Sequence, residues 1–158
     1  MSHTAVVEKW VESPLRQFVA EAGVELALLM HPSGQVMAQH GFTRSVDVMS
    51  ACALGAAIHA SSGELGRQLE GRAFRELHHA GEARQMYLAS GDTRRGPYLM
   101  LTVFDRETSL GLVRLYFEEF RAAIGAAAPP LPQDAPPVLA THFEHELNRN
   151  LAVLFGRA

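Results

Sequence analysis

The stretch that decides the fold is SACALGAAIHASSG, residues 50–63. Every side chain in it except Leu54, Ile58 and His59 belongs to Gly, Ala, Ser or Cys. We interpret it as the middle of one long helix over residues 46–70, with Ser45 as a plausible N-cap and Gly71 at its end. A helical glycine costs about 1 kcal/mol relative to alanine. Small residues at this cost predict a helix surface that another backbone approaches closely.

Two arrangements could supply that close approach. In the first, a second copy of the chain packs against the helix and a third protein binds the pair. We favour it because the small residues surround nearly the whole helix, whereas a sheet would use only one side. In the second, the helix merely packs on the sheet of its own molecule, and this alternative stays open.

The composition is that of an ordinary globular domain. Of 158 residues, 47% are apolar and 20% are charged, and 14 Lys/Arg against 17 Asp/Glu give a net charge of −3. No basic patch dominates, so nucleic acid is not an expected partner. The single cysteine, Cys52, excludes an internal disulfide and a thiolate-rich metal site, and its apolar neighbours indicate a buried, unreactive thiol. We expect neither a signal peptide nor a membrane span, so the cytoplasm is the expected location.

The first half of the chain predicts a helix and a hairpin. Apolar residues recur at helical spacing over residues 4–22. Pro14 indicates that the helix begins near Ser13, with Ser13 as its N-cap and residues 4–12 as a turn or leading helix. The run 26–30 and the segment around 36–38 are predicted strands, joined by the turn His31-Pro32-Ser33-Gly34.

The second half predicts three strands and two helices. Residues 73–78 carry enough charge to suit a sheet edge, residues 85–89 follow as a strand, residues 91–97 read as a loop, and residues 98–104 suit a central strand. Residues 110–124 are helical, and residues 126–137 are a linker rich in Pro and Ala. A second amphipathic helix is predicted over residues 138–156.

This order predicts an α+β domain over residues 13–125, in which helices sandwich a five-stranded antiparallel sheet in the order α-β-β-α-β-β-β-α, with an appended C-terminal helix. The helix at 46–70 is expected to cover the face opposite the first and third helices.

No catalytic set is present in the sequence. There is no phosphate-binding loop of the Walker type and no nucleophile elbow, so we expect a protein that is not itself an enzyme and needs no cofactor, metal or small-molecule substrate. His142, His145 and Glu146 could chelate a metal weakly, although a solvated helix face is the simpler interpretation. Arg44, Arg94 and Arg95 could each act as an inserted arginine toward a partner's phosphate, or could simply be solvated.

Three motifs together resemble the Roadblock family, which is named for dynein light chains and includes bacterial regulators of small GTPases. They are the hairpin LALLMHPSGQVMA at 26–38, the helical ALGAA at 53–57, and LTVFD at 101–105 followed by LGLVR at 110–114. The family often has Asp in the hairpin turn, where this chain has His31-Pro32. The tail helix after a proline-rich linker is similar to that of gliding-motility members of the family.

The resemblance implies a homodimer that binds a Ras-like small GTPase in bacterial motility or cell polarity and promotes GTP hydrolysis. Two copies would pair through the small-residue helix and the edge strand, and the residues expected at this interface are Ala53, Ala56, Ala57, Ala60, Ala73, Arg75 and Leu77. The GTPase would contact Leu54 and Ile58, and also Phe42, Thr43 and Arg44 at the helix start. The alternative is a dimeric scaffold that anchors partner proteins without changing GTPase turnover.

Overall fold

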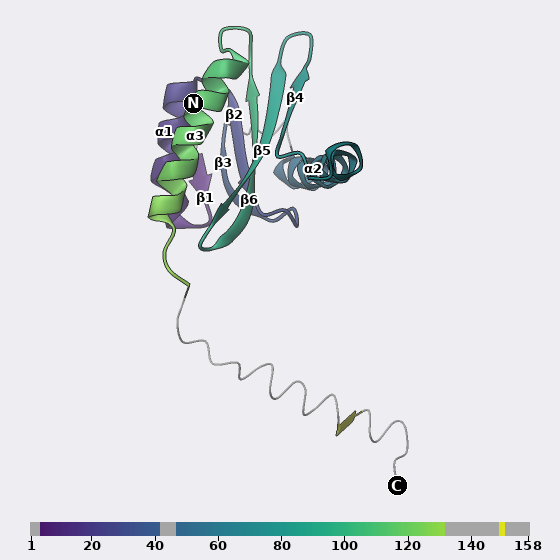
Figure 1. Cartoon of the computed structure of the whole chain (residues 1–158). Helices are drawn as coiled ribbons and strands as arrows, with labels where there is room; N and C mark the ends of the chain where they lie inside the picture. Colours follow the sequence, from purple (N-terminus) through teal and green to yellow (C-terminus); the bar gives the residue numbers. More distant parts are fainter. Residues whose placement is uncertain (1–3, 42–46, 132–148, 151–158) are drawn as a thin grey trace.

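The computed structural model describes residues 4–41, 47–131 and 149–150. These residues form a six-stranded antiparallel sheet in the order β1-β3-β2-β6-β5-β4. Helices α1 and α3 cover one face and α2 lies on the other (Figure 1). The predicted α+β class and the layering are therefore confirmed, and the sheet has one strand more than predicted.

The additional strand lies at the N-terminus. Residues Thr4–Val6 form β1, which pairs with β3, and a 3₁₀ turn over Lys9–Val11 leads into α1 (Glu12–Ala22). The predicted turn or leading helix over residues 4–12 is therefore wrong in its first part, because three residues are enough to add an edge strand to the sheet. Val11, not Ser13, is the N-cap residue. Pro14 still lies in the first helical turn, where its missing N–H costs little.

The hairpin at the centre of the sheet is confirmed. Its strands are β2 (Leu26–Met30) and β3 (Val36–His40). The His31 N–H donates to the Gln35 carbonyl at 2.8 Å, and Gly34 takes a φ of 90°, which suits glycine in this turn. Strand β2 also pairs with β6, so it lies inside the sheet, and its residues after Leu26 are fully buried.

Strands β4 (Glu76–Ala80), β5 (Gln85–Thr93) and β6 (Gly96–Phe104) complete the sheet. The edge strand predicted at 73–78 begins three residues later, because Ala73 and Phe74 pack on α2 instead. The loop predicted at 91–97 is wrong: only Arg94 and Arg95 lie between β5 and β6. Gly91 lies within β5 and does not begin a loop. Only glycine fits at this position, because the ring of Tyr98, its pair on β6, occupies the space that a larger side chain would need.

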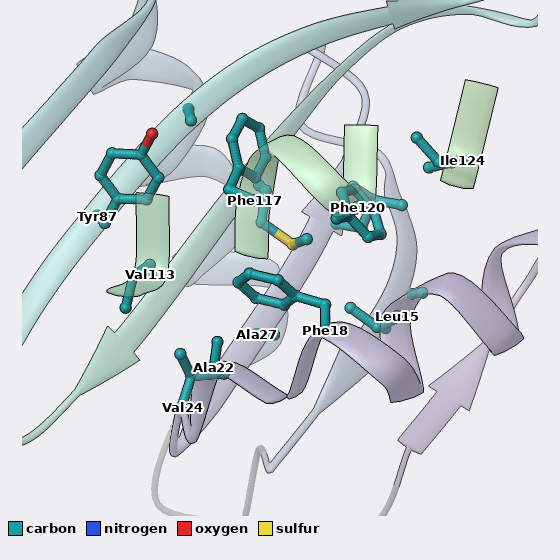
Figure 2. Packing of buried hydrophobic residues seen from close by; sticks show 14 of the residues in the cluster. Leu15, Phe18, Ala22, Val24, Ala27, Tyr87, Val113, Phe117, Phe120 and Ile124 are labelled. Carbon is teal, nitrogen blue, oxygen red and sulfur yellow. The ribbon is translucent and has the colours of Figure 1, made fainter. Parts of the chain in front are cut away.

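The larger core lies between the sheet and helices α1 and α3 (Figure 2). Phe18 of α1 and Phe120 of α3 pack with ring centroids 5.8 Å apart, and Phe117 packs edge-on against Tyr87 of β5 at 5.8 Å. Helix α3 spans Leu110–Ala127, three residues longer than predicted, and the Oγ of its N-cap Ser109 accepts from the Leu112 N–H at 3.2 Å. This core joins α1 and α3 to one face of the sheet and covers that face.

Helix α2 (Val48–Glu70) packs on the other face over a smaller core, made mostly by sheet residues. Its N-cap is Asp47 rather than the predicted Ser45, and the Asp47 carboxylate accepts from the Met49 N–H at 3.0 Å. Bonds from the Ser50 hydroxyl and the Met49 N–H lower the pKa of Asp47. Ser45, residues 42–44, the linker from residue 132 and nearly all of the predicted helix 138–156 lie outside the described residues.

Candidate partner-binding face of helix α2

The glycines of α2 point toward their own chain. Gly55, Gly63 and Gly66 are buried on the sheet side of the helix together with Cys52. A Cβ on Gly55 would lie 3.1 Å from the Met30 methyl group, and one on Gly66 would lie 2.5 Å from the Phe74 backbone nitrogen. Packing within one molecule therefore explains the glycines, as in the second of the two arrangements that the sequence leaves open.

The alanines of the same helix lie on its other side. Ala53, Ala57 and Ala60 are exposed, whereas Ala56 is half-buried beside Gly34 of the β2–β3 turn. These residues are spaced three and four apart, so they share one helix face. The structure thus brings together four of the residues predicted for the dimer interface, and three of them form an open strip without bulky side chains.

Two of the five residues predicted to contact a GTPase, Leu54 and Ile58, lie on one flank of this strip. Leu54 is 63% exposed. Ile58 lies one turn further along, but its side chain turns toward the sheet and packs partly against the smaller core. Phe42, Thr43 and Arg44 lie outside the described residues.

Two further leucines extend the flank and were missed by sequence reasoning. Leu65 is 51% exposed and Leu69 is 68% exposed. They lie 11 and 15 residues after Leu54, close to three and four helical turns, so they fall on the same side of α2. This spacing is visible in the sequence, but both leucines follow Gly63, where the small-residue stretch ends.

The predicted strand residues of the interface lie beside the C-terminal half of α2. Ala73 is exposed and lies next to Gly63, and Leu77 of β4 packs partly against the smaller core. Arg75 is exposed, and its carbonyl accepts from the Ser90 N–H at 3.0 Å. Strand β4 itself forms one edge of the sheet, as predicted, so its outer backbone groups face away from β5 (Figure 1).

A half-open cavity of about 890 Å³ lies between this end of α2 and the segment that enters β4. Its lining includes His59, Arg72, Phe74, Arg75 and Ser90. Burial lowers the pKa of His59, so its imidazole is held neutral near pH 7. The mixture of charged and apolar walls resembles the rim of a protein interface more than a small-molecule pocket.

The Glu76 carboxylate lies on the face of the sheet that α3 covers, opposite the face that carries α2. It accepts from the Tyr87 hydroxyl at 2.8 Å and pairs with the Arg114 guanidinium at 2.6 Å, which ties the start of β4 to α3. Burial, followed by this carboxylate, raises the pKa of Tyr87. The edge strand is therefore held in place on both faces of the sheet.

The remaining chemical candidates do not assemble into a site within the described residues. Arg94 and Arg95 form the exposed turn between β5 and β6, while Arg44, His142, His145 and Glu146 lie outside the description. Burial raises the pKa of the Cys52 thiol, which keeps it protonated and unreactive. The described residues contain no cluster of three or more His, Cys, Asp or Glu able to hold a metal ion.

No helix in the described part of the chain is both long enough and apolar enough to cross a bilayer.

Solved structures with the same fold include several named MglB. "Myxococcus xanthus MglB" superposes with a TM-score of 0.67 at 22% identity, over 76% of this chain and 95% of that one. The gliding protein MglB from Thermus thermophilus gives 0.64 at 26% identity, over 76% and 89%. A Roadblock/LC7 domain from Streptomyces avermitilis gives 0.59 at 14% identity, over 69% and 89%.

No protein-family sequence model matches this chain, and no curated protein matches it at a significant level. The similarity is therefore carried by the fold. That fold is the one shared by MglB and Roadblock/LC7 domains, which confirms the resemblance drawn from the three sequence motifs.

Proposed function

We propose that this chain is a homodimeric regulator of a Ras-like small GTPase, of the GTPase-activating type, acting in motility or cell polarity. The observation that carries the proposal is an MglB-like fold in which a strip of exposed alanines and a flank of exposed leucines lie on the outer side of α2, near an open sheet edge. One further structure of this fold is titled "MglB with tetrameric arrangement", at 24% identity. In this role the chain is a regulator and not an enzyme.

The proposed surface has two parts. The exposed alanines and the start of β4 accept the second copy, because small side chains let two helices approach closely and an open edge can add a strand. The residues assigned to this part are Ala53, Ala56, Ala57, Ala60, Ala73, Arg75 and Leu77. The leucine flank that begins at Leu54 accepts the GTPase, since exposed apolar side chains grouped on one surface mark an interaction site. Ile58, Phe42, Thr43 and Arg44 are assigned to this second part.

The test uses the Ras-like GTPase encoded nearest to the gene for this chain, with single-turnover phosphate release as the readout. We expect the chain to bind the GTP-loaded form and to accelerate hydrolysis. Binding with unchanged hydrolysis would replace the activating role with the scaffold alternative. Absence of both binding and acceleration would remove the proposal for that GTPase.

Replacement of Leu54 tests the GTPase-binding flank. Leu54→Arg places a charge in an apolar contact, and the GTPase dissociation constant should rise at least about tenfold. Because Leu54 is 63% exposed, the variant should fold like the parent. The matched control is Leu115→Arg on α3, where Leu115 is 55% exposed but lies on the other side of the sheet. Equal affinities for the two variants would move the GTPase site away from α2.

A further inference from the structure

We propose that the second copy pairs with β4 in one particular antiparallel register, with His78 on the two-fold axis. His78 then lies opposite its own counterpart, and Arg75 lies beside Glu82 of the second copy. This inference rests on the homodimer proposed above and specifies how its edge strands meet.

The hydrogen bonds of β4 to β5 determine which backbone groups are free. The Ser90 N–H donates to the Arg75 carbonyl at 3.0 Å, and the Gly81 N–H donates to the Arg84 carbonyl at 2.8 Å. Both bonds join directly opposite residues of an unbroken register. Bonded pairs alternate in an antiparallel ladder, so the odd residues 75–81 direct their N–H and C=O groups to β5. Glu76, His78 and Ala80 direct theirs outward.

A second copy can bond only to those outward groups. Two-fold symmetry pairs each residue that precedes the axis on one strand with the residue equally far after the axis on the other strand. An axis between two residues would place outward groups opposite groups already bonded to β5, so the axis must pass through a residue. An axis at His78 pairs all five residues of β4, with the outward pairs 76–80, 78–78 and 80–76. An axis at Leu77 or His79 pairs only three of them.

The charges at the two ends of β4 favour the same register. Arg75 precedes the strand and Glu82 follows it, and within the described residues neither side chain makes a hydrogen bond or an ion pair. An axis at His78 places Arg75 opposite Gly81 and next to Glu82 of the second copy, twice by symmetry. An axis at His79 would instead place Glu76 opposite Glu82, two carboxylates together. Glu76 does not compete for Arg75, because Tyr87 and Arg114 already bind it.

Cysteine substitution tests the register, because only a residue on the axis lies opposite its own counterpart. Opposite residues of a bonded antiparallel pair have Cα atoms about 5.5 Å apart, within the range that a disulfide spans. Under mild oxidation, His78→Cys should form a disulfide-linked dimer. Leu77→Cys and His79→Cys should not do so alone, but an equimolar mixture of the two should. The parent chain, with only the buried Cys52, is the control.

Each outcome distinguishes the register from the homodimer. Cross-linking of Leu77→Cys alone or His79→Cys alone would overturn the register at His78. A dimer by light scattering with no cross-link in any variant would overturn pairing through β4 while leaving the homodimer in place. A monomer by light scattering, for the parent chain, would overturn the homodimer itself.

A reciprocal charge exchange tests the pairing of Arg75 with Glu82. Arg75→Glu alone and Glu82→Arg alone should each weaken dimerisation about tenfold, because each dimer then holds two like-charged contacts. An equimolar mixture of the two variants, and the doubly substituted chain, should both regain the parent affinity. Weakening without recovery, or no weakening at all, would contradict this pairing.

Discussion

At the scale of single residues, the glycines of α2 are spacers within one molecule. Gly66 allows the segment that enters β4 to lie directly on the helix, since a Cβ there would come within 2.8 Å of the Arg72 carbonyl oxygen and 2.5 Å of the Phe74 nitrogen. Both contacts are with backbone, which cannot turn aside as a side chain can. Gly66 therefore sets the position of the edge strand relative to α2.

Substitution of Gly66 should be costly for this reason. Gly66→Ala is expected to lower the free energy of unfolding by about 1–3 kcal/mol, measured by guanidinium denaturation. The matched control is Gly125→Ala in α3, where a Cβ would meet nothing within 4 Å. That variant should be more stable than the parent by about 0.5–1 kcal/mol. If both alanines stabilised the chain, the close approach at Gly66 would be refuted.

Tyr98 predicts how stability changes at alkaline pH. Burial raises the pKa of its phenol to about 12, whereas the unfolded chain ionises near pH 10. The unfolded state therefore loses this proton first, and the free energy of unfolding should fall as pH rises from 10 toward 12. Burial raises the pKa of Tyr87 in the same direction.

Tyr98→Phe should lose less stability than the parent between pH 8 and pH 11 in urea denaturation, because one of the buried groups with a raised pKa is removed while Tyr87 and Cys52 remain. An equal loss in the variant and the parent would show that Tyr98 is not the source.

At the scale of elements, the sequence was informative where a pattern is local. The β2–β3 hairpin and helix α3 follow from apolar periodicity and turn residues. Strand β1 was missed because three residues carry too short a pattern, and its partner β3 is more than 30 residues away. The continuation of β5 through Gly91 was missed because a glycine usually indicates a loop, whereas here it leaves room for the ring of Tyr98 on the neighbouring strand.

The candidate site, too, could be predicted only in part from the sequence. The small-residue stretch could be located from sequence, but whether a small residue faces inward or outward depends on the packing of α2. The structure separates the glycines, which contact the same chain, from the alanines, which face outward. Leu65 and Leu69 join the site only once the exposed side of α2 is known.

The outer side of α2 can be tested without disturbing the fold. Ala57 is exposed, so Ala57→Glu should leave the fold, and therefore the circular dichroism spectrum, unchanged. The same change should weaken dimerisation at least about tenfold, because it places a charge in the close helix contact. Ala122→Glu on the exposed side of α3 is the matched control and should dimerise like the parent. Sedimentation of the two variants at equal concentration compares them, and indistinguishable behaviour would remove Ala57 from the interface.

At the scale of the whole molecule, the two faces of the sheet are built differently. Two helices and a large aromatic core close one face, whereas a single helix with a strip of alanines covers the other beside an open edge (Figures 1 and 2). The closed face holds the larger of the two cores, and the open face is the one we assign to partners. In the dimer that we propose, this open face contacts its own counterpart, as a two-fold axis requires.

Light scattering during size-exclusion chromatography tests this claim most directly, because coverage of the open face by a second copy doubles the particle mass. At roughly 10 µM chain, we predict a mass of 34.6 kDa, which is twice the chain mass of 17.3 kDa. A constant mass of 17.3 kDa at this and higher concentrations would contradict the account.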